Sequence, residues 1–282
     1  MPEGRYVDVG GGASLEAVVE GNGPLTVVFE NGLATPLEEW DAVVPRIAAR
    51  ARVVRYNHRQ APPRGPLPAI TVDSVMSDLD ALLRTIDARP PYVFVGHSWG
   101  GVLVRLFAHA HPADVAGLVF IDATHEALDE RTLAILPAMY SVMLALGQLG
   151  FLRRRLFRQL CPPGASEAYR TQFEERLRDP VRWPVGLRTA RAETPAIALA
   201  LARLRRDCPE LPPVPVEVLT AGKMTSRSAL RVYEGWKETV SRAARAEYRS
   251  VPAAGHYMAI DAPGDVAAAI IRVLDQITPP NH

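Results

Sequence analysis

An apolar segment that runs directly into a Gly-x-Ser-x-Gly turn constrains the fold of this chain more than any other feature. Residues 92–95 read Tyr-Val-Phe-Val, residues 96–101 read Gly-His-Ser-Trp-Gly-Gly, and a helix-compatible run follows. In this order of strand, turn and helix, the serine hydroxyl is presented where a base and backbone N–H groups can reach it. Gly96 and Gly100 permit the turn, because a Cβ at either position would collide with the neighbouring strand or helix. The pattern predicts that Ser98 is a nucleophile.

Short apolar segments alternate with helical patterns through the first half of the chain. This alternation predicts βαβ units and a mainly parallel sheet that is covered by helices on both faces. The first two strands adjoin glycine-rich turns at residues 10–12 and 21–23, and they are expected to form an antiparallel hairpin at the edge. The candidate strands are residues 6–9, 15–20, 25–30, 52–56, 92–95 and 117–121, and the candidate helices are 36–50, 72–88 and 101–110.

The alternation stops after Asp122 and resumes near residue 213. Residues 124–210 read as helices rich in Arg and Leu, without a convincing strand. The alternation then resumes with predicted strands at 214–220 and 247–251 and predicted helices at 226–246 and 266–277. We therefore expect one catalytic unit, in which a helical cap of residues 123–212 is inserted into a core of residues 1–122 and 213–282.

The composition bears on partners and location. The 282 residues include 32 Lys and Arg against 31 Asp and Glu, so the formal net charge of +1 creates no field that would attract nucleic acid. Cys161 and Cys208 form no metal-binding or redox pattern and are expected to be unpaired thiols. Residues 1–30 show no basic segment followed by an apolar stretch and a cleavage site, so we expect a cytoplasmic protein.

One apolar run, residues 133–152, requires a choice between a membrane and a packed protein interior. A membrane-spanning helix needs about 20 apolar residues without interruption. The run is broken by Pro137, Ser141, Gly147, Gln148 and Gly150. Its composition therefore favours a lid helix over an apolar pocket, and it leaves open a weak contact between the cap and a membrane surface.

The chain resembles the α/β-hydrolase superfamily over essentially its whole length. The Gly-x-Ser-x-Gly-Gly motif follows the fifth strand, the helical insertion follows the sixth, and His256 follows the last. The resemblance implies an eight-stranded, mostly parallel sheet flanked by helices, with an all-helical cap after strand 6. It also implies a catalytic triad in the chain order Ser, Asp or Glu, His, with His256 as the base.

The acid of this triad departs from the commonest pattern of the family. Family members usually place an aspartate just after the seventh strand, where residues 220–227 of this chain contain no carboxylate. Some relatives, including haloalkane dehalogenases, place the acid after the sixth strand, where this chain has Asp122. The resemblance therefore implies that Asp122 holds the His256 imidazole. Glu126 and a missing third member remain the alternatives.

The resemblance also implies an oxyanion hole formed by two backbone N–H groups. In the family, one group belongs to the residue after the nucleophile and the other to the loop after the third strand, which implies Trp99 and Leu33. His97 lies inside the nucleophile elbow with Gly96 and Gly100, and it is expected to support the turn.

Positions near the elbow differ from those of typical relatives. Glu30 ends the third strand and is expected to be buried and to bond locally. Asn57 and Gln60 replace an aspartate and a glycine of the turn at residues 56–65, which is expected to change the rigidity of the turn. His58, in the same turn, is expected to be solvent-facing or structural.

Cleavage of an ester by a serine hydrolase is the leading hypothesis for the function. Ser98 stands where epoxide hydrolases and dehalogenases of this superfamily need an aspartate, so those reactions are disfavoured. No dinucleotide, nucleoside triphosphate or metal motif occurs, and we expect neither a cofactor nor a metal. The expected partner is a hydrophobic small-molecule substrate, in a pocket walled by Leu133, Leu136, Met139, Tyr140, Met143 and Leu146.

Two alternatives to ester hydrolysis remain at this point. A specialised biosynthetic enzyme on the same fold would carry out acyl transfer, lactone chemistry or cyclisation, and a non-catalytic receptor would use the fold only to bind a ligand. The sequence leaves the oligomeric state open. A cluster of cap arginines is expected to be a solvated face, with an anionic substrate as the alternative: Arg153, Arg154, Arg155 and Arg158.

Overall fold

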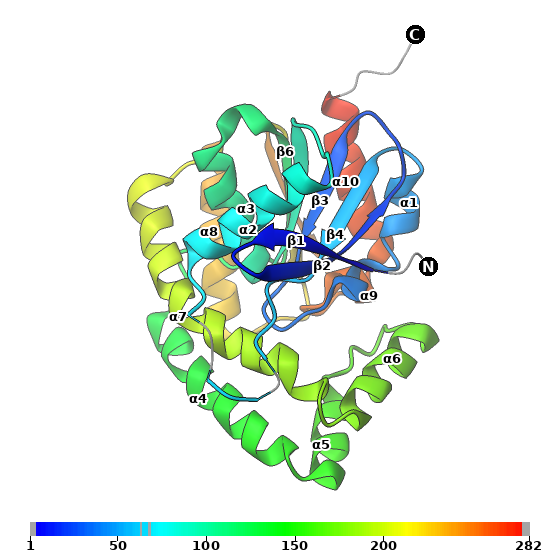
Figure 1. Cartoon of the computed structure of the whole chain (residues 1–282). Helices are drawn as coiled ribbons and strands as arrows, with labels where there is room; N and C mark the ends of the chain where they lie inside the picture. Colours follow the sequence, from blue (N-terminus) through cyan, green and yellow to red (C-terminus); the bar gives the residue numbers. More distant parts are fainter. Residues whose placement is uncertain (1–3, 63, 67–68, 278–282) are drawn as a thin grey trace.

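The computed structural model of the chain contains one eight-stranded sheet with helices on both faces (Figure 1). The structure describes residues 4–62, 64–66 and 69–277. The strands lie side by side in the order β1-β2-β4-β3-β5-β6-β7-β8. Their bounds are β1 Arg5–Gly10, β2 Ala13–Glu20, β3 Thr26–Glu30, β4 Arg52–Tyr56, β5 Tyr92–His97, β6 Val115–Ile121, β7 Val216–Ala221 and β8 Ala246–Val251.

The direction of the strands divides the sheet into two parts. β1 and β2 form the expected antiparallel hairpin, and β2 also pairs antiparallel with β4. The remaining pairs, from β4 and β3 through β8, are all parallel. β3 and β5 are buried along their whole length, in keeping with the apolar runs at residues 27–29 and 92–95. The predicted mostly parallel sheet is confirmed, and its parallel strands end at a common edge.

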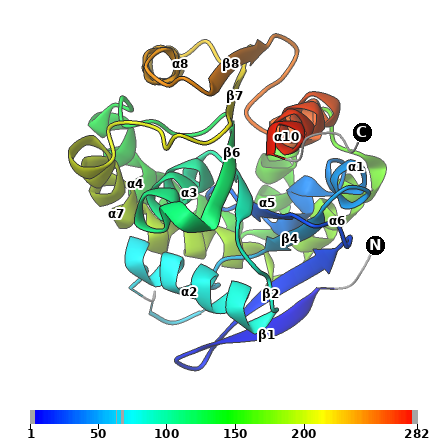
Figure 2. The same cartoon turned by 90° about the horizontal axis from the view of Figure 1, so that it is seen from above.

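Helices cover the two faces of the sheet (Figure 2). One face carries α2 (Val72–Thr85), α3 (Trp99–Ala110) and α8 (Arg227–Ser241), and the other carries α1 (Val44–Ala48) and α10 (Pro263–Ile277). Each face encloses its own apolar core. The short helices η1 (Leu37–Trp40), η2 (Pro112–Asp114) and α9 (Met258–Asp261) lie in the connections.

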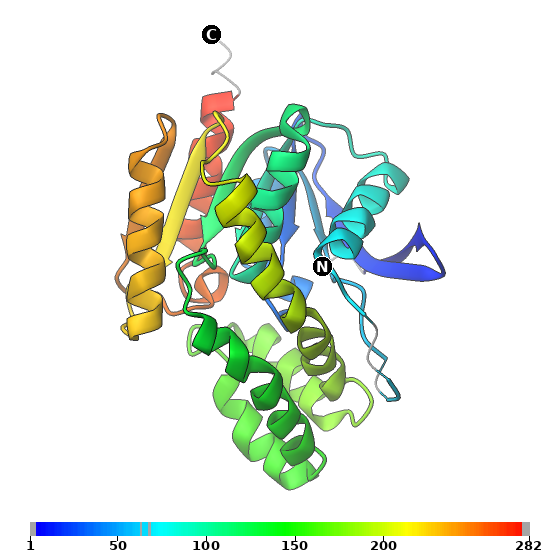
Figure 3. The ribbon, with the colours of Figure 1, turned by 90° about the vertical axis from the view of Figure 1, so that its left-hand side faces the viewer.

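Four helices lie between β6 and β7 in the sequence, and we call them the inserted helices. They are α4 (Glu130–Gly147), α5 (Gly150–Phe157), α6 (Glu167–Arg178) and α7 (Trp183–Asp207), with a short η3 (Arg158–Leu160) after α5. Figure 3 shows α4, α5 and α6 below the sheet and α7 rising from them along α3. The C-terminal half of α7 packs against α3 through Ala196, Ile197, Ala200, Leu201 and Leu204. Pro195 lies inside α7, just before this half.

The predicted elements agree with the structure except where a turn interrupts a helical pattern. The helix expected over residues 36–50 is two short helices, η1 and α1. Pro45 lies in the first turn of α1, where its missing N–H is tolerated and its fixed φ favours a new helix start. Within the described residues, none of the helices combines the length and the apolar character needed to cross a membrane.

Candidate active site

Ser98 lies in the sharp turn between β5 and α3, with backbone angles φ 51° and ψ −118°. A non-glycine residue rarely adopts a positive φ, so the surrounding contacts must hold it there. The Ser98 N–H donates to the carbonyl of Ile121 at the end of β6, at 3.2 Å. A Cβ on Gly100 would lie 2.4 Å from the carbonyl oxygen of Glu30, so glycine is required for this close approach. The turn is therefore clamped between the ends of β3 and β6.

Asp122 and His256 meet next to this turn, although 134 residues separate them in the sequence. The Nδ1 atom of His256 lies 2.6 Å from Oδ2 of Asp122. The other carboxylate oxygen accepts hydrogen bonds from the Ala221 N–H at 2.9 Å and the Tyr233 hydroxyl at 2.7 Å. The side chain of Asp122 is 4% exposed, whereas that of His256 is 37% exposed. The structure thus gives His256 a buried, oriented carboxylate and an accessible ring.

The environment of Asp122 favours its ionised form. Burial alone would raise the pKa of Asp122, but the hydrogen bonds from His256, Ala221 and Tyr233 outweigh it. The pKa of Asp122 consequently lies below its ordinary value. A carboxylate that stays ionised can stabilise a positive charge on the neighbouring imidazole.

The alternative acid, Glu126, has other partners. Its Oε2 atom accepts from Arg105 Nη1 at 2.7 Å and lies 3.5 Å from Nε2 of His125. His125 also contacts the Thr239 hydroxyl, and burial lowers the pKa of His125 to about 4. Glu126 therefore belongs to a second polar cluster, and Asp122 is the carboxylate in contact with His256.

His97 connects the turn to two neighbouring loops. Its Nε2–H donates to the carbonyl of His256 at 2.9 Å, and the two rings pack with centroids 4.8 Å apart. Its Nδ1 atom lies 2.9 Å from Oε2 of the buried Glu39, in an ion pair without good hydrogen-bond geometry. Burial opposes a charge on His97, but Glu39 outweighs burial and raises the pKa of His97. His97 thus holds the loop of His256 beside the elbow.

The loop after β3 contains the other expected oxyanion residue, Leu33. Asn31, next to Glu30 at the end of β3, donates to the carbonyl of Tyr56 at 2.7 Å and accepts from the Trp40 indole at 2.8 Å. The Gly32 N–H points to Oε1 of Glu39 at 3.4 Å. These contacts fix the start of the loop, and Leu33 itself borders the cavity described next.

A cavity of about 650 Å³ lies between the inserted helices and the loops at the edge of the sheet. Leu33, Asn57, His58 and Tyr257 line it from the sheet side, and Tyr257 directly follows His256 in the sequence. The inserted helices contribute mainly apolar and aromatic side chains: Met139, Tyr140, Met143, Phe173, Leu177, Trp183 and Leu187. The cavity is thus mostly apolar; its lining includes Leu33 and Tyr257, the neighbour of His256, but not Ser98 or His256.

The predicted pocket wall is correct for three of its six residues. Met139, Tyr140 and Met143 line the cavity. The prediction is wrong for Leu133 and Leu136, which pack in the core between α3 and α7, and for Leu146, which is 39% exposed. The sequence of α4 shows that the helix is apolar. It does not show which neighbouring element each face of the helix contacts.

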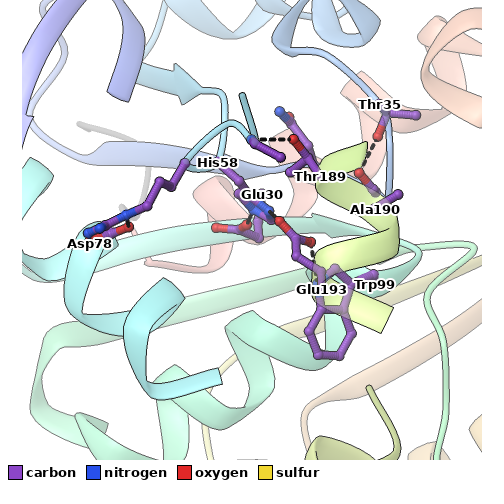
Figure 4. A network of polar contacts seen from close by, with 12 residues as sticks. Glu30, Thr35, His58, Asp78, Trp99, Thr189, Ala190 and Glu193 are labelled. Carbon is purple, nitrogen blue, oxygen red and sulfur yellow. Dashed lines mark hydrogen bonds and ion pairs between the residues drawn. The ribbon is translucent and has the colours of Figure 1, made fainter. Parts of the chain in front are cut away.

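Sequence reasoning missed a buried network that joins the sheet to α7 (Figure 4). His58 Nδ1 lies 3.0 Å from Oε1 of Glu193, and His58 Nε2 contacts Oε1 of Glu30. The indole N–H of Trp99 donates to Oε2 of Glu193 at 3.1 Å, and the Tyr56 hydroxyl donates to Oε2 of Glu30. Glu30 is buried as expected, but its partners come from β4 and the turn after it, and no motif marks Glu193, which lies 135 residues from His58.

Asn57 and Arg59, in the turn at residues 56–65, are anchored to other segments of the chain. Oδ1 of Asn57 accepts from the Leu37 N–H at 2.9 Å, and its amide donates to Glu16 at 2.9 Å. Arg59 forms two hydrogen bonds to Asp78, at 2.9 and 2.6 Å. An asparagine can both accept and donate, so this side chain ties the turn to two other segments.

The arginine cluster does not form one solvated face. Arg154 and Arg155 are exposed, and Arg158 pairs with Glu174 at 3.2 Å. Arg153 is buried, donates to the carbonyls of Leu177 and Gly147 at 2.6 and 3.2 Å, and lies over the Trp183 ring. The prediction of a solvated face is wrong for Arg153, because its guanidinium satisfies carbonyls at the ends of α4 and α6.

Cys161 and Cys208 are both free thiols.

Similar proteins span several chemistries. Over 104 residues the chain is 32% identical to the uncharacterized protein YqjL of Bacillus subtilis, a match that covers 36% of this chain and 41% of that protein. The chain is 24% identical to a haloalkane dehalogenase of Sphingobium indicum, with 98% of this chain and 97% of that protein covered. The solved structure of a thermophilic esterase from Thermogutta terrifontis is similar at a TM-score of 0.71 and 17% identity, with 98% and 99% covered.

The match to YqjL spans less than half of that protein, and the likeness to the esterase shows the fold alone. The family model for the alpha/beta hydrolase fold, by contrast, matches residues 26–263, which include the sheet from β3 to β8, the inserted helices and the loop of His256. The chain therefore belongs to the alpha/beta hydrolase fold family.

Proposed function

We propose that this protein is a serine hydrolase that cleaves a carboxylic ester, thioester or lactone of a hydrophobic small molecule. The observation that carries the proposal is the 2.6 Å contact between His256 Nδ1 and Asp122, beside a serine at positive φ on the elbow. Because Asp122 accepts the Nδ1 proton, the lone pair of His256 is on Nε2, where a general base needs it.

The first half of the reaction forms an acyl-enzyme. Ser98 Oγ attacks the carbonyl carbon of the ester while His256 Nε2 takes the hydroxyl proton, and Asp122 stabilises the imidazolium that results. The carbonyl oxygen becomes an oxyanion, which the backbone N–H groups of Leu33 and Trp99 would bind. The bond from the carbonyl carbon to the alcohol oxygen then breaks, and His256 gives its proton to the departing alcohol.

The second half releases the acid and restores the enzyme. Water attacks the acyl carbon, His256 Nε2 takes one of its protons, and the same two N–H groups bind the second oxyanion. The bond to Ser98 Oγ then breaks, and the serine regains its proton from His256. Every proton that His256 accepts is returned within the cycle, so the proposal needs no cofactor.

No hydrogen bond joins the Ser98 hydroxyl to His256 in the described part of the chain. Catalytic hydrogen bonds often shorten only when substrate is bound. We therefore expect the contact between Ser98 Oγ and His256 Nε2 to form in the substrate complex.

The residues of the site, rather than the fold, select this reaction. Proteins named as a dehalogenase and as an esterase share the fold with this chain, so the fold alone does not choose between them. Attack on a halogenated carbon or an epoxide in this superfamily uses an aspartate, and this chain has Ser98 at that position. The mostly apolar cavity next to the site favours a hydrophobic acyl or alcohol group.

Hydrolysis of p-nitrophenyl esters, from acetate to decanoate, tests the proposal. We expect the purified protein to turn over at least one ester, and Ser98→Ala to lower kcat/KM by about 10⁴-fold or more. Ser241→Ala is the matched control, because Ser241 is exposed and its hydroxyl donates to the carbonyl of Glu238 in its own helix. A fluorophosphonate probe should label Ser98.

The outcomes separate the candidate functions. Labelling without turnover of any ester would replace the hydrolase proposal with a specialised acyl-transfer or lactone reaction on the same serine. A folded protein that is neither labelled nor active would contradict the nucleophile itself and favour a binding function.

A further inference from the structure

Three ionisable side chains are buried together between the sheet and α7. Glu30, His58 and Glu193 have side chains that are 0%, 8% and 2% exposed. Figure 4 shows His58 between the two carboxylates, with the Trp99 indole against Glu193. Buried ion pairs seldom stabilise a protein more than well-packed apolar residues would. A cluster of this kind in a folded chain therefore invites a functional explanation.

The hydrogen bonds of the cluster are complete. Each ring nitrogen of His58 faces one carboxylate, an arrangement in which an imidazolium can donate from both nitrogens. The two remaining carboxylate oxygens accept from the Trp99 indole and the Tyr56 hydroxyl. Burial opposes the charge on His58, but Glu193 and Glu30 outweigh burial and raise the pKa of His58 well above its ordinary value. Removal of any member therefore leaves a buried partner unsatisfied.

The cluster also touches both segments that would form the oxyanion hole. Trp99 directly follows Ser98, and its indole is held by Glu193 from α7. Glu30 ends β3, three residues before Leu33, and is held by His58. Glu193 is thus the single residue of the inserted helices whose hydrogen bonds, among those of the described residues, reach Trp99 and His58 together.

We propose that Glu193, acting with His58, is a positioning residue for the oxyanion hole. The inference rests on the proposed function. Glu193 fixes the side chain of Trp99, and His58 carries the same restraint to Glu30 at the base of the loop that contains Leu33. This restraint would hold the backbone N–H groups of Leu33 and Trp99 in place for the oxyanion, and displacement of either donor would weaken transition-state binding.

Glu193→Gln tests this role with almost no change in shape. A glutamine has one carbonyl oxygen and one NH₂ group, so it can accept from Trp99 or from His58, but not from both. The Trp99 indole can only donate, so the amide oxygen is expected to meet Trp99; the NH₂ group then faces His58 Nδ1, which must lose its proton to accept. We expect kcat on the best p-nitrophenyl ester to fall about 10- to 100-fold, with KM changed less than about threefold.

The matched control is Glu217→Gln. Glu217 is as buried as Glu193 and forms two hydrogen bonds to Arg272, at 2.7 and 2.8 Å, on a distant part of β7. This change should lower stability without lowering kcat of the folded fraction. If Glu193→Gln behaves in the same way, Glu193 is only structural and the proposal is wrong.

A pH profile gives a second readout that a structural role would not change. The charged groups that face His58 are Glu30 from β3 and Glu193 from α7, and the Tyr56 hydroxyl of β4 completes the cluster. In the wild type, deprotonation of His58 at alkaline pH should lower kcat. In Glu193→Gln, His58 is already neutral, so this alkaline decrease should be absent. An identical alkaline decrease in both proteins would overturn the proposal.

Nuclear magnetic resonance of the His58 ring separates failure of this inference from failure of the proposed function. A titration that finds the wild-type ring charged at neutral pH and the variant ring neutral would establish the protonation change without any turnover. If the ring is neutral in the wild type, the inference fails even when ester hydrolysis is intact. If the ring behaves as expected but no ester or probe reacts with Ser98, the proposed function fails and the positioning role falls with it.

Discussion

His256 and His58 both contact carboxylates, but their surroundings suit opposite tasks. His256 faces one carboxylate and its side chain is 37% exposed, whereas His58 lies between two carboxylates and is 8% exposed. A base must gain and lose a proton in every cycle, so it needs one oriented partner and an accessible second nitrogen. A histidine held by two buried carboxylates keeps its proton and acts as a fixed positive charge. The number of carboxylates and the access of the ring distinguish the two histidines.

The largest expected effect comes from removal of the charge that orients His256. Asp122→Asn should lower kcat by about 10⁴-fold, because an amide can present an N–H to His256 and stabilise the wrong tautomer. The rate of ester hydrolysis measures the effect. Glu126→Gln is the control, since Glu126 pairs with Arg105, and we expect it to change kcat less than about threefold. A large loss in the control and none in Asp122→Asn would reverse the assignment of the acid.

Replacement of His58, the fixed positive charge, should mainly lower the stability of the fold. His58→Gln leaves two buried glutamates without their common partner, and loss of one member of a buried ion pair costs about 3–5 kcal/mol. Urea unfolding of the variant and the wild type measures this difference in the free energy of unfolding. His111→Gln, at a histidine that is 41% exposed, should change the free energy by less than about 0.5 kcal/mol. Equal values for both variants would show that His58 is not held as described.

The contribution of His58 to stability should depend on pH with a definite sign. The folded protein raises the pKa of His58 above its unfolded value, so the contribution is complete below about pH 6.5 and is lost as the pH rises through the folded pKa. The difference in unfolding free energy between wild type and His58→Gln should therefore shrink at alkaline pH. A difference that grows with pH would mean that the ring is neutral in the fold.

The smallest expected effect comes from loss of the hydrogen bond between Tyr233 and Asp122. Tyr233→Phe removes one hydrogen bond to the carboxylate and leaves the contact with His256 in place, at a cost of about 1 kcal/mol. The pKa of Asp122 is lowered in the fold, so its contribution to stability is lost as the pH falls through that pKa. Acid unfolding of Tyr233→Phe should begin at a higher pH than that of the wild type. An unchanged acid transition would show that the tyrosine does not stabilise the ionised carboxylate.

Local patterns in the sequence were sufficient for most of the sheet and for the elbow. The apolar run before Gly96 predicted β5, and residues 52–56 were predicted as a strand with the bounds that β4 has. Both depend on neighbours in the sequence, since a short run that is mainly apolar or β-branched favours a buried strand. The contact of Asp122 with His256 was expected from the family resemblance, and the structure brings the two side chains together.

The contacts of the helical insertion could not be predicted in the same way. Glu193 reads as an ordinary helix glutamate, and only the packing of α7 places it against Trp99 and His58. The choice between Asp122 and Glu126 also depended on distant residues, because Arg105 from α3 forms an ion pair with Glu126. Side-chain partners far apart in the sequence are fixed by tertiary packing, which periodicity does not record.

The continuity of α7 limits how this protein can be re-engineered. β6 and β7 are parallel neighbours, so the chain must cross from one end of the sheet to the other between them, and α7 makes that crossing. Its first half lines the cavity through Trp183, Leu187 and Thr189, and its second half packs in the core on α3. Exchange of residues 123–212 as a block for the insertion of another protein would remove the connection that α7 makes between β6 and β7. The natural junction is Pro195, where the helix already lacks one backbone hydrogen bond.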